Sequence, residues 1–409
     1  MANETEVAII GAGAAGIAAA RRLRDQGRTV LVIEAMDRVG GRAHSIQAEG
    51  VTLDLGCGWL HSAERNPLVA VAEAEGAVID RSAAAWRDQL RNLGFSVADQ
   101  RAAQAAFAAL EDALRREPPS DDVAGRAIAH DHPWRGNLDM ISGALNGAEL
   151  DGVSAADLLA YDDHASDLNW RLPNGYGTLI ARLADPLPIT LATRVAAIDQ
   201  RGRRIAIDTD RGRIEAQAAI VTVPTDILAR GDIRFDPDVT DHLDAAACLP
   251  LGRVDKLFLA IDEPSLIPPE SHLVGNPHVA ETGSYYLRPF GAPVIECFFG
   301  GIMARRLEEE GEGARTAFAI SELAALLGSR FAQGLRPIEG SWWHKEATIG
   351  GAYSHARPGC ADKRAVLARP VSERLLFAGE ACSAHDYSTA HGAWASGIAA
   401  AEIVNAELR

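Results

Sequence analysis

The chain has 409 residues and a formal net charge of −16 at pH 7, with 47% hydrophobic and 23% charged residues. This composition is ordinary for a soluble enzyme, and the length suits two domains better than a single core. The acidic balance argues against nucleic acid or an anionic membrane surface as a partner, and it is compatible with cationic small molecules.

The cysteines and the N-terminus narrow the class further. No cysteine pair has CxxC spacing, so we expect neither a disulfide framework nor a metal site. The five cysteines are Cys57, Cys248, Cys297, Cys360 and Cys382. The acidic start MANETE leads directly into an apolar strand and does not read as a signal peptide, and no apolar run approaches the length of a membrane span. We expect a cytoplasmic protein.

The first motif is a strand–turn–helix–strand unit between residues 6 and 45. Gly11 allows the tight turn, Gly13 lets the backbone approach a diphosphate, and Gly16 lets the helix pack against the strand. The start of the helix then faces the anion. Glu34, at the end of the second apolar strand, is placed to accept hydrogen bonds from an adenosine ribose. The unit predicts a dinucleotide-binding domain without settling which dinucleotide binds.

The residues after Glu34 carry a family resemblance that bears on which dinucleotide binds. The string AMDRVGGRAHS, residues 35–45, resembles the segment that follows the ribose acid in FAD-dependent amine oxidases. The resemblance implies that Gly41 and Arg42 lie along the FAD diphosphate. The chain departs from this family at Met36, where an arginine is usual.

A second string, LDLGCGWLHSAERNP at residues 53–67, is similar to the segment of polyamine oxidases that carries Trp-Ile-His-Gly and Asn-Pro. The resemblance implies that Gly58 and Trp59 approach the flavin and that His61 faces the substrate. Taken alone, His61 could equally be a structural histidine. Asn66 followed by a proline predicts the start of a helix.

Residues 84–170 match no motif of the family. Within them we expect an alanine-rich helix at residues 100–116 and a short helix capped by Ser154. Asp162 and Asp163 could bind an amine, but a solvated loop is the favoured interpretation.

From residue 172 a glycine turn, a helix and two alternating strands are expected, with the strands around Val195 and Ile205. This part resembles the second FAD-domain segment of the family. The resemblance implies that the backbone of Val195 holds the edge of the adenine.

Residues 249–264, LPLGRVDKLFLAIDEP, predict a strand with one lysine among apolar residues. The string resembles the family's Pro-Leu-Gly strand, whose lysine reaches the reactive ring nitrogen of the flavin through a water. The resemblance implies a catalytic role for Lys256. The alternative is a lysine that extends from a strand edge into solvent.

Residues 341–359, SWWHKEATIGGAYSHARPG, resemble the family segment with a tryptophan near the flavin, a double glycine and an aromatic residue at the substrate. The resemblance implies those two roles for Trp343 and Tyr353. Ala352 stands where monoamine oxidases have the cysteine that bonds to the flavin. We therefore expect non-covalent FAD.

Residues 375–404 predict a strand, a Gly-Glu turn and a helix that begins near Thr389. The resemblance implies that Glu380, next to Gly379, binds the ribityl chain, and that Thr389 and Ala390 lie at the flavin. A helix start there can stabilise the negative charge of a reduced flavin. Thr389 also stands at the substrate, where monoamine oxidases place the second wall of an aromatic cage, so a two-walled cage is not expected.

Together these strings predict an α/β fold with a discontinuous, Rossmann-like FAD-binding domain and a second, α+β substrate domain, as in amine oxidases. We expect the FAD-binding domain in residues 1–76, 174–247 and 345–409. The substrate domain would comprise residues 77–173 and 248–344.

The resemblance implies an FAD-dependent amine oxidase that oxidises a carbon–nitrogen bond of a primary or secondary amine, with a polyamine favoured. Hydride would pass to the flavin, O₂ would reoxidise it to give hydrogen peroxide, and the imine would hydrolyse to an aldehyde. The alternatives are an L-amino acid oxidase in which Arg288 binds the carboxylate, a flavin-bound protein without turnover and, more distantly, an NAD dehydrogenase. The amine and oxygen are the expected partners, and the oligomeric state is left open.

Overall fold

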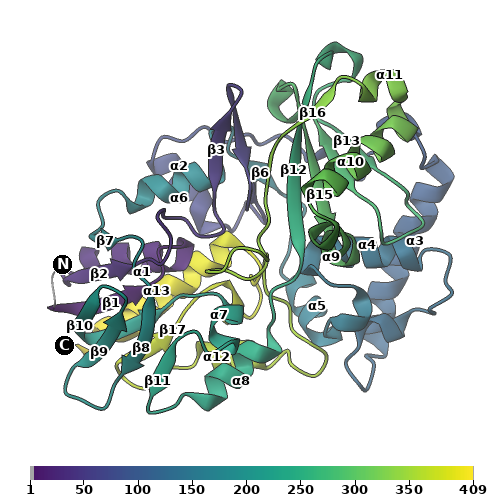
Figure 1. Cartoon of the computed structure of the whole chain (residues 1–409). Coiled ribbons are helices and arrows are strands. Elements are labelled where there is room, and N and C mark those ends of the chain that lie inside the picture. Colours follow the sequence, from purple (N-terminus) through teal and green to yellow (C-terminus); the bar gives the residue numbers. More distant parts are fainter. Residues whose placement is uncertain (1–3, 409) are drawn as a thin grey trace.

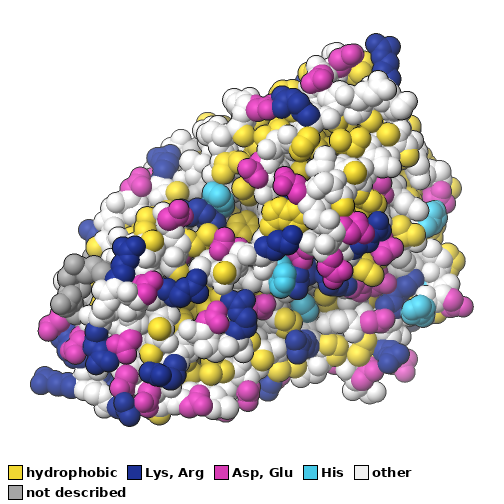
Figure 2. All heavy atoms as spheres, viewed as in Figure 1, with side chains coloured by type: hydrophobic (Ala, Val, Ile, Leu, Met, Phe, Trp, Pro, Cys, Tyr) yellow, Lys and Arg dark blue, Asp and Glu magenta, His cyan; other side chains and the backbone are white. Residues whose placement is uncertain are grey.

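The structure is a computed structural model, and it describes residues 4–408. Two β-sheets, one of eight strands and one of five, form its two halves, with helices around them (Figure 1). On the face shown in Figure 2, basic and acidic side chains are interspersed. Among the residues that the structure describes, no helix is long and apolar enough to cross a membrane.

The eight-stranded sheet is built around two central strands, β1 and β10. Its strands are β1 (Glu4–Ile10), β2 (Val30–Ile33), β7 (Ile189–Thr190), β8 (Val195–Asp199), β9 (Ile205–Thr209), β10 (Gly212–Val221), β11 (Arg234–Asp236) and β17 (Leu375–Phe377). The order is β11-β8-β9-β10-β1-β2-β7, and β17 also pairs with β10. β1 runs parallel to both of its neighbours, whereas β8, β9 and β10 are antiparallel. Parallel strands joined through a helix are what the glycine motif predicts.

Helices cover both faces of this sheet. One face packs against α1 (Ala14–Asp25), α2 (Pro67–Ala74), α6 (Tyr176–Ala184) and α13 (Ala390–Glu407). The other packs against α7 (Thr225–Ala229), α8 (Thr240–Cys248) and α12 (Lys363–Ala368). Successive strand residues point to opposite faces, so Val7 and Ile9 enter the first layer while Ala8 and Ile10 enter the second. Burial on both faces explains the unbroken apolar runs of β1 and β2.

The five-stranded sheet is antiparallel, in the order β13-β14-β15-β12-β16. Its strands are β12 (Val254–Ile261), β13 (Ser271–Val274), β14 (Ser284–Leu287), β15 (Val294–Gly300) and β16 (Leu335–Gly340). One face packs against α9 (Gly301–Glu310), α10 (Glu312–Leu327) and α11 (Ser329–Ala332). The other face is left for the cavity described below.

The segment without a family motif is helical. It forms α3 (Val97–Arg116), α4 (Arg135–Asn146) and α5 (Ala155–Asp162), which share a small apolar core. The hairpin of β3 (Ser45–Ala48) and β4 (Val51–Asp54) lies between the halves, and so does the antiparallel pair of β5 (Trp59–Leu60) and the distant β6 (Trp170–Arg171) (Figure 1).

The predicted helix starts are confirmed. The side chains of Asn66, Ser154 and Thr389 each accept a hydrogen bond from a backbone N–H of the helix that follows. The solvated loop expected at Asp162 and Asp163 is wrong. Asp162 is the last residue of α5 and Asp163 is its C-cap, because the Asp163 N–H still donates to the Leu159 carbonyl; Arg115 of α3 pairs with both carboxylates.

The α/β architecture with two sheets is the predicted fold class. The strands of the eight-stranded sheet come from three separate parts of the chain, residues 4–33, 189–236 and 375–377, whereas those of the five-stranded sheet come from residues 254–340. The exact domain boundaries stay a prediction.

Candidate active site

A cavity of about 1310 Å³ extends from the glycine turn before α1 to the open face of the five-stranded sheet. This exceeds the volume of an ordinary small-molecule site, so a large cofactor and a substrate fit together. Nearly all of the predicted site residues line it. They are Gly11, Gly13, Glu34, Gly41, Arg42, Gly58, Trp59, His61, Val195, Lys256, Trp343, Tyr353, Gly379, Glu380, Thr389 and Ala390. Gly16 lies just behind the wall, in α1.

The dinucleotide end has the features that a diphosphate needs. Gly11 has a φ of +108°, which favours glycine. A Cβ at Gly16 would lie 1.9 Å from the carbonyl oxygen of Gly11, so only glycine fits there. α1 begins at Gly13 without a side-chain cap, which leaves its first N–H groups facing the cavity. These observations fit the diphosphate of FAD.

Glu34 holds the glycine turn itself. One carboxylate oxygen accepts a hydrogen bond from the Ala12 N–H at 2.6 Å and the other from the Met36 N–H at 2.8 Å. Burial raises the pKa of Glu34 despite these two donors. Met36 and Val195 line the same end of the cavity. The contacts of Glu34 with a ribose and of Val195 with adenine stay predictions.

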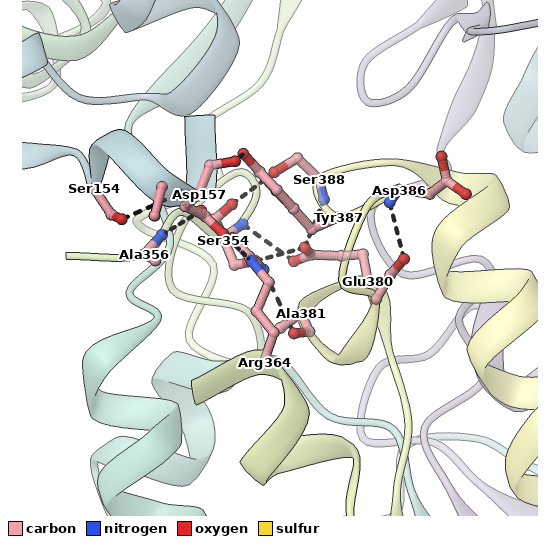
Figure 3. Close-up of polar contacts among 12 residues, drawn as sticks. Ser154, Asp157, Ser354, Ala356, Arg364, Glu380, Ala381, Asp386, Tyr387 and Ser388 are labelled. Carbon is pink, nitrogen blue, oxygen red and sulfur yellow. Dashed lines mark hydrogen bonds and ion pairs between the residues drawn. The ribbon is translucent and has the colours of Figure 1, made fainter. Parts of the chain in front are cut away.

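Arg42 and Glu380 form an ion pair, Nη1 to Oε1, at 2.9 Å. Glu380 also accepts hydrogen bonds from the N–H and hydroxyl of Ser354 and from the Ser388 N–H (Figure 3). Burial alone would raise the pKa of Glu380, but Arg42 and the hydrogen bonds outweigh burial and hold it below its usual value. An ionised Glu380 therefore fixes Arg42 at the cavity wall. The predicted contact of Glu380 with the ribityl chain is not tested by this arrangement.

Sequence reasoning missed the charge pair behind Glu380. Arg364 of α12 donates two hydrogen bonds to Asp157 of α5, and a third, at 2.9 Å, to the hydroxyl of Ser354 (Figure 3). The Arg364 guanidinium also lies 3.6 Å from the ring centre of Tyr387, whose hydroxyl donates to the backbone carbonyl of Asp157. An arginine in a polar stretch carries no sequence signal for such a partner.

The floor of the cavity is one face of the five-stranded sheet. Strand alternation places Leu257, Leu259 and Cys297 in the apolar core on the opposite face. The residues that line the cavity from these strands are Val254, Lys256, His272, Val274, Ser284, Tyr286, Glu296 and Phe298. The sheet therefore offers the cavity a mixed polar and aromatic surface.

Lys256 is neither isolated nor at a strand edge. It lies on β12, an interior strand that pairs with β15 and β16, and its side chain is only 7% exposed. Its Nζ donates to the backbone oxygen of Asp54 at 3.0 Å and lies 2.8 Å from a carboxylate oxygen of Glu296. A Cβ at Gly58 would be 3.6 Å from the same Nζ. The solvent-facing alternative for Lys256 is therefore wrong, and sequence reasoning missed Glu296.

His61 lies among aromatic side chains on another wall. Its Nδ1 is 2.7 Å from the Asn169 side-chain oxygen, and burial lowers the pKa of His61 to about 4. A neutral imidazole that donates from Nδ1 keeps Nε2 as an acceptor. Trp86 lies 6.3 Å from His61 and 4.3 Å from Trp59, between ring centres. Asn169 and Trp86 both come from the stretch that matched no motif.

The remaining predicted residues are held by hydrogen bonds. The indole N–H of Trp343 donates to the Leu55 carbonyl at 3.2 Å, and the hydroxyl of Tyr353 donates to the Ala144 carbonyl. The Thr389 hydroxyl accepts from the Gly392 N–H and caps α13, so this helix begins at the cavity wall. A threonine here supplies no aromatic ring, and the expected lack of a two-walled cage around the substrate stays a prediction.

Arg288 is not placed to bind a substrate carboxylate. Its guanidinium donates to the backbone carbonyls of Ile267 and Gly291, and it is not among the residues that line the cavity. The cation that we expected of an L-amino acid oxidase is therefore absent at this position.

The comparisons with known proteins agree with this geometry. The family model described as flavin containing amine oxidoreductase matches residues 14–405. Polyamine oxidase 2 of Arabidopsis thaliana is 28% identical, over 97% of this chain and 87% of its own length. A solved structure of wild-type putrescine oxidase bound to putrescine has a TM-score of 0.79 and 21% identity, covering 98% of this chain and 99% of that one. The cyclohexylamine oxidase from Brevibacterium oxydans IH-35A has a TM-score of 0.79 and 23% identity, over 99% of both chains.

Proposed function

The chain belongs to the family of flavin-containing amine oxidoreductases, and from this premise we propose that it oxidises a carbon–nitrogen bond of an extended di- or polyamine. The observation that carries the proposal is the position of Lys256 beside Gly58, in the same cavity as the glycine turn. The similarity to a polyamine oxidase over nearly the whole chain supports the substrate class.

When bound, FAD would supply a two-electron acceptor for the hydride lost from the carbon next to the amine nitrogen, with O₂ as the final oxidant; amine, water and oxygen would then yield aldehyde, a shorter amine or ammonia, and hydrogen peroxide. Gly11, Gly13 and Arg42 would hold its diphosphate. Gly58, Trp343 and Thr389 would surround its ring.

The chain's own residues bind and orient the amine. The cavity wall combines aromatic surface from Trp59 and Tyr286 with carboxylates at Glu111 and Asp162. Aromatic faces and carboxylates both attract the ammonium groups of a polyamine. Burial and the neighbouring Asp162 raise the pKa of Glu111 to about 7, so a bound ammonium would draw this carboxyl into its ionised form.

The reacting nitrogen must lose its proton, because its lone pair assists the departure of the hydride. His61 is neutral at pH 7 and therefore adds no positive charge that would oppose a cationic substrate. The distant ammonium groups can remain charged on the carboxylates. Flavin reduction should therefore accelerate as pH rises through the pKa of the bound amine.

An anaerobic stopped-flow experiment tests the proposal. The flavin-loaded protein is mixed with spermine, an acetylated spermine, putrescine, benzylamine or an L-amino acid, and the visible flavin absorbance is followed. We expect the di- and polyamines to bleach the flavin fastest. Faster bleaching by benzylamine or the amino acid rejects the substrate class, and a pH-independent rate rejects the neutral-amine requirement.

A flavin that no amine bleaches would favour a binding protein without turnover. The same samples, mixed with air in a peroxidase-coupled assay, report whether oxygen is reduced to hydrogen peroxide in proportion to the amine consumed.

A further inference from the structure

Glu296 is the partner that the sequence did not assign to Lys256. The two residues lie on neighbouring antiparallel strands, where Lys256 is opposite Phe298 and Glu296 is opposite Phe258. Residues directly opposite share a face, and so do residues two apart on one strand, which makes Lys256 and Glu296 diagonal neighbours on the cavity floor. The observed distance of 2.8 Å between Nζ and Oε1 follows from this register.

Two of the three N–H donors of Lys256 are then accounted for. One donates to the Asp54 carbonyl oxygen at 3.0 Å, and the Glu296 carboxylate, 2.8 Å from Nζ, is the ionic partner on a second side. An ammonium has three donors in a tetrahedral arrangement, so two fixed partners also fix the direction of the third. Lys256 lines the cavity beside Gly58, so the third donor is available to an acceptor inside the cavity.

We propose that Glu296 is a positioning residue: together with the Asp54 carbonyl it holds the Lys256 ammonium so that its third N–H is presented to the flavin site. The proposal rests on the proposed function. It assigns no step to Glu296 itself, which acts through Lys256.

The charge of Glu296 matters as well as its hydrogen-bonding oxygen. The Lys256 side chain is 7% exposed and that of Glu296 is 20% exposed. A buried ammonium needs an anionic partner to offset its lost hydration. Glu296→Gln keeps an acceptor of nearly the same shape but removes this charge, so it separates the two contributions.

The chain contains only three lysines, Lys256, Lys345 and Lys363, which makes a direct observation possible. In the flavin-loaded protein with isotope-labelled lysine side chains, NMR should show three Cε–Nζ signals, and Lys256→Met should remove one and thereby assign it. We expect Glu296→Gln to move the Lys256 signal and to leave the signals of Lys345 and Lys363 in place. An unmoved Lys256 signal would overturn the proposal.

A matched control separates charge from position. Glu339 lies on β16 of the same sheet, is exposed, and accepts a hydrogen bond from the Gly340 N–H. Glu339→Gln makes the same chemical change on the same sheet, and it should move neither the Lys256 signal nor any rate.

A double-mutant cycle tests whether Glu296 acts through Lys256. Each variant is reduced chemically and mixed with O₂, which needs no amine, and is separately reduced by the amine without oxygen. In the half-reaction that Lys256→Met slows, we expect Glu296→Gln alone to cost about tenfold, or about 1.4 kcal/mol in barrier. In the Lys256→Met background, Glu296→Gln should change the rate of the same half-reaction by less than about twofold.

Three results would overturn the proposal in this cycle. They are an undiminished effect of Glu296→Gln in the Lys256→Met background, a weakened amine affinity without any change in rate, and wild-type rates for Lys256→Met. The second would make Glu296 a substrate ligand.

Two further outcomes are distinguishable. If no amine reduces the flavin, the proposed function is wrong. The NMR signals and the reaction with oxygen still test the positioning role of Glu296, because neither needs an amine. If Glu296→Gln unfolds, Glu296→Asp takes its place: it keeps the charge at a shorter reach, so a moved Lys256 signal supports the proposal and an unmoved one opposes it.

Discussion

Arg364 and Asp157 form a buried bidentate ion pair, with Nε to Oδ1 at 2.6 Å and Nη2 to Oδ2 at 2.8 Å. Each side chain is 2% exposed. The pair joins α12 to α5, and Ser354 extends it to Glu380 (Figure 3). Glu380 in turn pairs with Arg42. A helix at the substrate end of the cavity is therefore connected by side chains to the arginine at its dinucleotide end.

Removing one partner of this pair should be strongly destabilising. Arg364→Met leaves the Asp157 carboxylate buried without its counter-ion, which costs about 3–5 kcal/mol in the free energy of unfolding. Urea denaturation of the flavin-loaded protein measures the loss. The control is Arg369→Met, whose ion pair with Asp241 is solvent-exposed at 3.4 Å and should contribute at most about 1 kcal/mol. Equal losses in the two variants would contradict the prediction.

Lys256→Met should leave the flavin bound and the fold intact, because methionine has a similar length and Glu296, which is 20% exposed and lines the cavity, can be hydrated once the lysine is gone. We expect one half-reaction of the flavin to slow by one or more factors of ten, each equal to about 1.4 kcal/mol in barrier. Stopped-flow absorbance measures both half-reactions. Unchanged rates would give Lys256 a purely structural role.

Gly16→Ala should abolish flavin binding and lower the melting temperature. The added Cβ would stand 1.9 Å from the Gly11 carbonyl oxygen, so the glycine turn must move away from the diphosphate. Gly313→Ala in α10 is the control, because a Cβ there meets nothing within 4 Å. Flavin absorbance after gel filtration and the melting temperature are the measurements. A yellow, wild-type-like Gly16→Ala protein would refute the role of the turn.

The flavin should leave the protein when the chain is denatured. Ala352 lines the cavity and offers no nucleophile to the ring. After acid precipitation we expect the yellow colour in the supernatant and a colourless pellet. Colour that stays with the pellet would show a covalent link to another side chain.

His272 should make stability depend on pH. It is buried, and burial lowers its pKa to about 4, below the ordinary value of about 6.5 for an unfolded histidine. The unfolded state therefore binds more protons between these values, so the contribution of neutral His272 is complete above pH 6.5 and is lost as pH falls towards 4.

The measurement is the difference between variant and wild type, because burial raises the pKa of Asp54 and of Asp255 and these carboxyls titrate in the opposite sense. Relative to His272→Asn, the wild type should lose up to about 1.4 kcal/mol of unfolding free energy per pH unit in this window. Urea midpoints at pH 7, 6 and 5, with saturating FAD, test it. Parallel profiles would exclude a titrating His272.

The strands and helix starts were predictable because their signals are local. The glycine motif, the proline after Asn66 and the serine at residue 154 each report on the few residues that follow them. Glu296 and Asp157 carried no such signal, because their partners are distant in sequence and reach them only through sheet register or helix packing.

The resemblance to amine oxidases located site residues only within segments that match a motif of the family. It located none where no motif matches. The stretch of residues 84–170 supplies Trp86, Asn169 and Asp162 to the cavity, and none of them could be placed from the sequence. Arg288 was the residue on which the amino acid oxidase alternative depended: its charge suggested a carboxylate partner, but after β14 its guanidinium donates to two backbone carbonyls.

The close packing of α1 against α13 means that the sheet and helices around the dinucleotide site can assemble only late in synthesis. A Cβ at Gly397 would lie 2.0 Å from the Ala15 carbonyl oxygen, so the two helices touch backbone to backbone, and the marked ends of the chain lie on one side of the molecule (Figure 1). The β1–α1–β2 unit is synthesised well before β10, β17 and α13, which complete the sheet and the helical layer around it. The apolar surface of this unit therefore remains exposed to solvent during translation. The dinucleotide site is complete only after α13 has been synthesised.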